Sequence, residues 1–136
     1  MKKETSIIFI LLAILCSHFG LGQQRFNNCS AAFLNGKMLV NEYSPAGKCS
    51  VSINEKGNLT ISTVELSSKE NKAIDPIMFQ VAIKDKNTGT LMMVSKQGIQ
   101  KISIHKVLEK CKKGDSILLL TNSDEYSLPH NEILVL

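Results

Sequence analysis

The sequence predicts a mostly β protein, an antiparallel immunoglobulin-like β-sandwich that carries one short helix. Two observations lead to this class. About eight short segments alternate with period two or stay apolar over the length of a strand, and turn-forming residues separate them. The 136 residues, of which 43% are hydrophobic and 21% charged, suffice for one packed domain and argue against wholesale disorder. A strongly twisted β-barrel is the alternative architecture.

The first two strands are expected at 30–34 and 37–41, on either side of Asn35-Gly36. A type I′ turn needs positive φ at both central residues, and Asn followed by Gly tolerates this best. The sequence therefore predicts that a β-hairpin opens the domain.

Two further strands are expected at 49–54 and 59–66, after a loop at 44–47 and a turn at 55–58. Along 59–66 the apolar residues change face after Ile61. Either a β-bulge lies near residues 62–63, or both faces of this strand are covered. The pattern leaves both possibilities open.

Residues 67–76 are polar and charged, which predicts an exposed connection. The alternation that follows predicts a strand at 77–84, and the turn residues at 85–89 predict a hairpin with 90–95. Met92 and Met93 lie in this last strand, and packing in the core is the expected fate of such an apolar run. The alternative is a pliable, exposed apolar binding strip.

One short helix is predicted at 105–112, because apolar residues there recur at helical spacing and Gly114 follows. Three lysines near its end fit a solvated helix terminus, although they could also contact an anionic surface: Lys110, Lys112 and Lys113. The segments 117–120 and 133–136 are continuously apolar. Both are expected to be strands buried on two faces.

The start of the chain predicts export. Lys2 and Lys3 precede an apolar run at 7–15, and small residues follow up to Gly22, which is the pattern of a cleaved signal peptide at 1–22. The run is too short for a membrane anchor, which needs about 20 residues. Lipidation of Cys16 is disfavoured because Leu15 stands where a small residue is preferred. Cleavage would leave a single domain, 23–136, that is periplasmic or extracellular.

Cleavage also removes two lysines and one glutamate, which lowers the formal net charge from +4 to +3. Three cysteines remain, and Cys29 with Cys49 is the expected disulfide, because each begins an alternating segment that would point both thiols inward. Such a bridge would contribute about 3 kcal/mol. The alternative is that these two and Cys111 are reduced, buried thiols.

No motif for catalysis, a metal or a cofactor is present, so we expect a non-enzymatic protein. His105 and His130 lie outside any zinc-ligand spacing, and neither a nucleophile elbow nor a phosphate-binding glycine loop occurs. An enzyme would have to combine Cys49 or Cys111 with His130 through the fold. The small charge excess and the lack of Trp give little support to nucleic-acid binding.

Residues 57–120 resemble the C-terminal β domain of the gliding-motility protein GldM family. The residues that carry the resemblance are Gly57, Leu59, Val64, Ser67, Phe79, Val81, Ile83, Asp85, Leu108 and the run Gly114-Asp115-Ser116-Ile117. The resemblance implies a periplasmic β-sandwich used for protein contact, with no catalytic residues. Longer family members add a membrane helix and further periplasmic domains that couple a motor to secretion and gliding, so we expect only the contact role here.

The expected function is that of an exported protein-interaction module of the bacterial cell envelope, with an envelope or secreted protein as partner. Edge strands are the expected contact surface, because they present unpaired backbone groups. The first hairpin, 30–41, and the loop before Pro76 are the expected recognition elements. The alternative is a secreted small-molecule or carbohydrate binder, although only 5% of the residues are aromatic.

Overall fold

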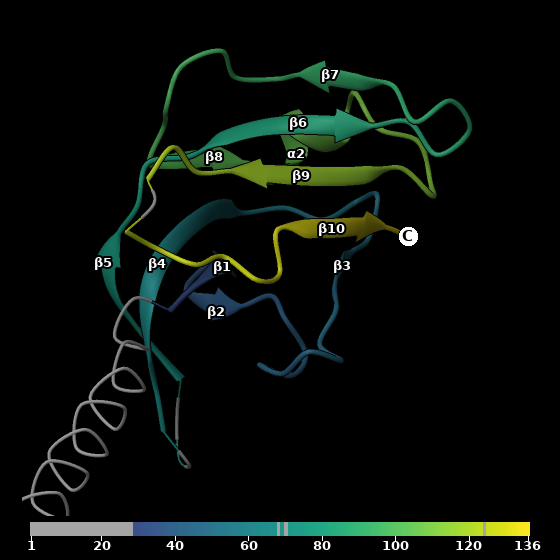
Figure 1. Cartoon of the computed structure of the whole chain (residues 1–136). Helices are drawn as coiled ribbons and strands as arrows, with labels where there is room; N and C mark the ends of the chain where they lie inside the picture. The colour runs from purple at the N-terminus through teal and green to yellow at the C-terminus, as the bar shows by residue number, and fades with distance from the viewer. Residues whose placement is uncertain (1–28, 68, 70, 124) are drawn as a thin grey trace, which may run out of the picture.

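The computed structural model describes residues 29–67, 69, 71–123 and 125–136 (Figure 1). Over these residues the chain forms two five-stranded sheets and one short helix, which confirms the mostly β class. The predicted signal peptide, 1–22, lies outside the described residues.

The first sheet has the strand order β2-β1-β4-β5, and β8 also pairs with β4. Its strands are β1 (Ser30–Leu34), β2 (Lys37–Met38), β4 (Asn58–Leu66), β5 (Asn71–Pro76) and β8 (Lys101–Ser103). The second sheet has the order β3-β10-β9-β6-β7. Its strands are β3 (Cys49–Val51), β6 (Gln80–Lys84), β7 (Leu91–Met93), β9 (Ser116–Leu120) and β10 (Glu132–Val135). All these neighbours are antiparallel except β3 and β10, which are parallel.

The predicted first hairpin is confirmed. Asn35 and Gly36 adopt φ values of 51° and 80°, as a type I′ turn requires, and Phe33 pairs with Met38. The prediction that this hairpin is an exposed recognition element is wrong for β1. That strand lies between β2 and β4, so both of its backbone edges are paired, and its residues up to Phe33 are buried.

The bulge that the sequence left open near residues 62–63 lies in the pairing of β4 with β5, and its extra residue belongs to β5. Ser62 pairs with Pro76 and Val64 with Ala73, so two residues of β5 lie opposite Thr63. The exposed connection expected at 67–76 is a strand in its second half, since β5 pairs with β4 although all its residues are exposed. Pairing in a two-stranded ribbon satisfies backbone groups without burying side chains, and Figure 1 shows the two strands extending together from the body.

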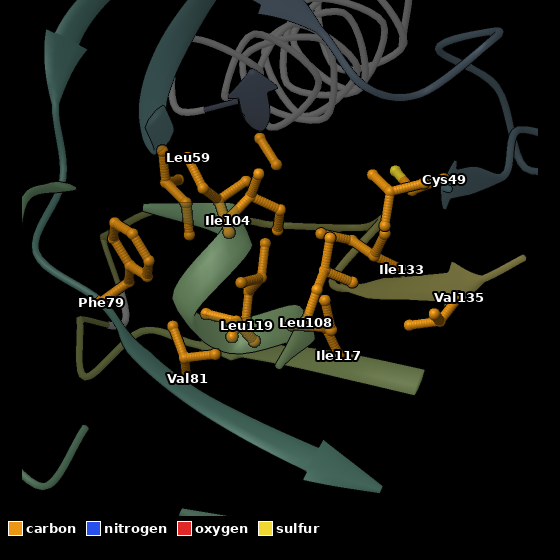
Figure 2. Packing of buried hydrophobic residues seen from close by; sticks show 14 of the residues in the cluster. Cys49, Leu59, Phe79, Val81, Ile104, Leu108, Ile117, Leu119, Ile133 and Val135 are labelled. Atoms are coloured by element: carbon orange, nitrogen blue, oxygen red, sulfur yellow. The ribbon is translucent and has the colours of Figure 1, made fainter. Parts of the chain in front are cut away.

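Helix α2 (Ile104–Leu108) is shorter than the predicted 105–112. After it, the N–H groups of Lys110 and Cys111 bond to carbonyls three residues back, which tightens the chain into turns. All the apolar residues of the helix are buried in one core with residues of both sheets. Figure 2 shows Ile104 and Leu108 among Leu59, Phe79 and Leu119.

The two apolar runs predicted to be buried on both faces are buried on one face only. Ile117 and Leu119 of β9 are buried, whereas Leu118 between them is half-buried. Strand β10 repeats this alternation, with Leu134 exposed between two buried residues. The second set of apolar side chains therefore points away from the core, and its members are half-buried in β9 and exposed in and after β10.

The alternation from Ile77 to Ile83 confirms the strand predicted there, although its ladder begins at Gln80. The predicted hairpin to β7 is also confirmed, with Gly89 at φ 70° in the turn. The prediction that Met92 and Met93 pack in the core is wrong, because β7 is an edge strand and both residues are exposed.

We predict that Gly57→Ala destabilises the fold by about 3 kcal/mol, against about 1 kcal/mol for Gly36→Ala. Gly57 has a φ of 125°, and a Cβ there would collide with the side-chain amide of Asn35, which accepts a 3.0 Å hydrogen bond from the N–H of Asn58. At Gly36 a Cβ would meet open space. Urea denaturation measures both losses, and equal losses would contradict the packing at Gly57.

Candidate functional site

The outward surface of the second sheet carries large apolar side chains that the core does not bury. Side chains alternate between the two faces of a strand. Ile117, Leu119, Ile133, Val135, Val81 and Ile83 belong to the core, so their neighbours in sequence point away from it. Paired residues share a face, and the register of β6 with β7 places Leu91 and Met93 on the outward side.

Six large apolar side chains therefore lie on this outward side, which we call the leucine face: Leu91, Met93, Leu118, Leu120, Leu134 and Leu136. Four of them are strongly exposed, namely Leu91 (56%), Met93 (42%), Leu134 (43%) and Leu136 (55%). The six come from three strands, β7, β9 and β10 with the residue that directly follows it, and the four exposed ones from the first and last of these. Polar side chains share this side with them, namely Gln80, Lys84, Ser116 and Glu132. A group of exposed apolar side chains on one side of a small domain indicates a contact site.

A hollow of about 520 Å³ adjoins one end of the leucine face, over β3 and β10. Leu134 and Leu136 belong to both features. The remaining lining is Gly47, Lys48, Cys49, Ser50, Ser116, Pro129, His130, Asn131 and Glu132. The lining of the hollow thus combines apolar side chains with hydroxyl, amide, imidazole and carboxylate groups.

Cys49 and His130, which the sequence named as a possible nucleophile and base, come together in this hollow, but in the wrong arrangement. The thiol of Cys49 donates to the backbone carbonyl of His130 (3.8 Å), and the imidazole bonds elsewhere. Its Nε2 lies 2.8 Å from the carbonyl of Ser44, which can only accept, so Nε2 carries the proton. Burial raises the pKa of Cys49 to about 11, which keeps the sulfur a neutral thiol.

Tyr43 connects this region to the first sheet. Its ring packs edge-on against His130, with centroids 5.3 Å apart, and its hydroxyl donates to the carbonyl of Ser30 (3.1 Å). Burial, followed by the neighbouring Cys29, raises the pKa of Tyr43 to about 12. These contacts hold the loop before β3 against β1 and indicate a structural role.

The predicted Cys29–Cys49 disulfide is not formed in the structure, where both residues and Cys111 are thiols. Cys29 directly precedes β1 in the first sheet and contacts Tyr43, whereas Cys49 begins β3 in the second sheet and contacts the His130 carbonyl. Each sulfur therefore has a different neighbour.

The other candidates do not assemble into a site. The Cys111 thiol donates to the Val107 carbonyl (3.4 Å), and burial raises its pKa to about 11. His105 lies 3.3 Å from the carboxylate of Glu109 on the exposed side of α2. Among the described residues, no group of three His, Cys, Asp or Glu side chains could hold a metal ion.

Sequence reasoning missed the leucine face because a continuous apolar run has two interpretations. The runs at 117–120 and 133–136 fit a strand covered on both sides equally well. The polar Glu132 and Ser116, which lie on the same outward side as Leu134, were the signal that this side meets solvent.

The raised pKa values predict a loss of stability at alkaline pH. Cys49 is a neutral thiol in both states below its ordinary pKa of 9.0, and its folded pKa is about 11. Between these values the unfolded chain ionises first, so stability falls as pH rises. We expect the urea midpoint to fall less between about pH 8 and about pH 10.5 in Cys49→Val than in the wild type. An identical fall in both proteins would contradict the buried neutral thiol.

Within the part of the chain that the structure describes, no helix is long and apolar enough to cross a membrane. No family model matches the chain, and no curated protein or solved structure is significantly similar to it. The function is therefore argued from the leucine face and the hollow beside it.

Proposed function

We propose that this chain is a non-enzymatic, exported protein-interaction module of the bacterial cell envelope, which binds a protein partner through the leucine face. The observation that carries the proposal is the exposure of apolar side chains of β7 and β10 on one side of one sheet. Side chains such as Leu134 add little to the core, so a partner that removes them from water is the simplest reason for them.

The residue types of the leucine face fit a specific contact. Burial of a Leu or Met side chain contributes about 1.5–3 kcal/mol relative to leaving it in water, and the centre of a stable interface is made of such residues. The exposed members of the leucine face lie on the edge strand β7 and on or directly after β10, with β9 and β6 between these strands. The half-buried Leu118 and Leu120 of β9 adjoin β10, whereas β6 contributes Gln80, Ala82 and Lys84 to this side. A partner could cover them together.

The N-terminal sequence also supports the proposal, because it predicts export. The basic residues Lys2 and Lys3, the apolar run at 7–15 and the small residue Gly22 favour a cleaved signal peptide. The immunoglobulin-like sandwich belongs to the same proposal, since two sheets of five strands around one core are compatible with it. The similarity of residues 57–120 to the GldM C-terminal domain also favours a contact role in the envelope.

A second candidate function is supported by the hollow over β3 and β10. Its volume of about 520 Å³ lies in the range of small-molecule sites, and Ser50, His130 and Glu132 could bind polar groups of a ligand. None of its lining residues is Phe, Tyr or Trp, so stacking on a sugar ring is not available. A small polar molecule with an apolar part is the ligand class that this alternative predicts.

Substitution of the leucine face tests the main proposal. We expect Leu134→Lys and Leu136→Lys to reduce crosslinking of the tagged mature protein to its envelope partner at least tenfold, because a lysine cannot be buried at little cost. Both residues are exposed, so the urea midpoint should stay close to that of the wild type. The readout is the partner band in mass-spectrometric quantification, compared with a tag-only sample.

Matched controls lie on the other sheet. Leu66 and Ile74 on the β4–β5 ribbon are exposed to a similar extent, 45% and 49%, and lie outside the leucine face. Leu66→Lys and Ile74→Lys should leave the crosslink unchanged. Equal crosslinking by all four variants would contradict the proposal.

Processing tests the export component. Intact mass of the protein recovered from its own cells should correspond to a chain that begins at Gln23, because the signal peptide is expected to end at Gly22. The same fractionation shows whether the mature protein is in the periplasm or the medium. Recovery of a chain that retains residues 1–22 would overturn export by this route.

A further inference from the structure

We propose that β7 is completed in the cell by an added strand, an extended partner segment that is apolar at its centre and acidic at the end beside Leu91. This inference rests on the proposed function and specifies how the partner is held. β7 is an edge strand whose only neighbour among the described residues is β6. All three of its side chains are exposed.

The hydrogen bonds around β7 show which of its backbone groups are open. The N–H of Asp85 donates to the carbonyl of Thr90 (2.9 Å), and the N–H of Val94 donates to the carbonyl of Val81 (2.8 Å). In an antiparallel pair the hydrogen-bonded positions alternate, so Met92 also faces β6. Leu91 and Met93 therefore point their N–H and C=O groups away from the sheet.

Leu91 and Met93 determine how an added strand would pair with β7. A strand beside β7 would form hydrogen-bonded pairs with Leu91 and Met93, and its side chains there would extend the leucine face. Its intervening residue would lie on the inward side beside Met92, which is 46% exposed next to the buried Ile83. The centre of the added strand must therefore be apolar on both sides.

The lysines near Leu91 indicate that the adjacent end of the partner segment is acidic. Lys84 pairs with Leu91, and the amides of Lys86 and Lys112 both bond to the Asp115 carboxylate at the same end of the sheet (3.1 and 2.7 Å). The ammonium groups of these three exposed lysines have no carboxylate within ion-pair distance in the described part of the chain. An acidic residue on the partner would supply one.

Two carboxylates lie near the three lysines at this end, which leaves a positive excess. Asp115 is buried and accepts two backbone N–H groups. Asp85 accepts the N–H groups of Thr88 and Asn87, which hold the pKa of its carboxyl below the ordinary value, and the charge of Lys112 lowers it as well. Both carboxylates thus bond to backbone N–H groups. Lys113, which follows Lys112 in the sequence, adds another exposed positive charge.

The same charges argue against a second copy of this chain as the occupant. If two β7 strands paired antiparallel about Met92, the Leu91 end of one copy would meet the Met93 end of the other. The segment 90–96 that would pair contains no Asp or Glu and ends in Lys96. A second copy would therefore not supply the carboxylate that the lysines near Leu91 lack.

The test uses a defined probe, a fluorescein-labelled peptide with the order Asp-Asp-Val-Leu-Val-Thr-Asp-Asp, and the mature wild-type protein. The acidic residues at both ends allow either strand orientation. We expect saturable binding in fluorescence polarisation that weakens with added salt, and at least tenfold weaker binding of a peptide in which Lys replaces every Asp. Amide exchange at Leu91 and Met93 should slow on binding, whereas the bonded amide of Met92 should not change.

Met93→Pro is the decisive variant, because it removes an outward N–H and leaves the hydrogen bonds to β6 in place. We expect at least tenfold weaker probe binding, while Met93→Val, which keeps the N–H, should bind within twofold of the wild type. Lys84→Glu should weaken binding about fivefold, and Lys101→Glu on β8 of the other sheet should not. The urea midpoint of each variant verifies that it is folded.

Unchanged binding by Met93→Pro would overturn the added strand. So would a wild-type dimer that Met93→Pro abolishes, which would identify a second copy, or binding to anionic vesicles that depends on Lys84 and not on the Met93 N–H. If Met93→Pro still crosslinks to the envelope partner while Leu134→Lys does not, the proposed function stands and this inference fails. If the wild type crosslinks to nothing, the proposed function itself fails.

Discussion

The rest of the structure depends on the burial of one face of the second sheet against the first. Ile117, Leu119, Ile133 and Val135 must leave water together with α2, and this fixes the register of β9 with β10 and of β9 with β6. Because side chains alternate between the two faces of a strand, the neighbours of these residues in sequence must point outward. Leu118 and Leu134 are turned outward by the same pairing that stabilises the core, so the leucine face is a direct consequence of the packing.

This arrangement separates stability from recognition along the same strands. Val81 and Ile83 stabilise the fold, whereas Leu91 and Met93 of the neighbouring β7 contribute exposed side chains and open backbone groups. Substitution of an inward residue should therefore destabilise the domain before it alters any contact. Substitution of an outward residue can change a contact without unfolding the protein, which makes the proposed role accessible to mutagenesis.

Local chemistry made part of the fold predictable from the sequence. Asn35-Gly36 identified the first hairpin because few residue pairs tolerate two positive φ values. The change of face after Ile61 pointed to the place where β4 and β5 shift register, although the extra residue is in β5. The sequence did not reveal that β5 pairs, because an exposed ribbon has no apolar pattern to mark it. It also did not reveal the leucine face, since what covers the second side of an apolar strand is decided by segments far away in the chain.

The measurement that tests this account most directly is carbene footprinting of the leucine face, in the isolated mature protein and in intact envelopes of its own cells. The account predicts that Leu134 and Met93 label strongly in isolation and are protected at least fivefold in the envelope, while Ile74 on the β4–β5 ribbon labels equally in both. Equal labelling of the leucine face in the two samples would contradict the claim that a partner covers it.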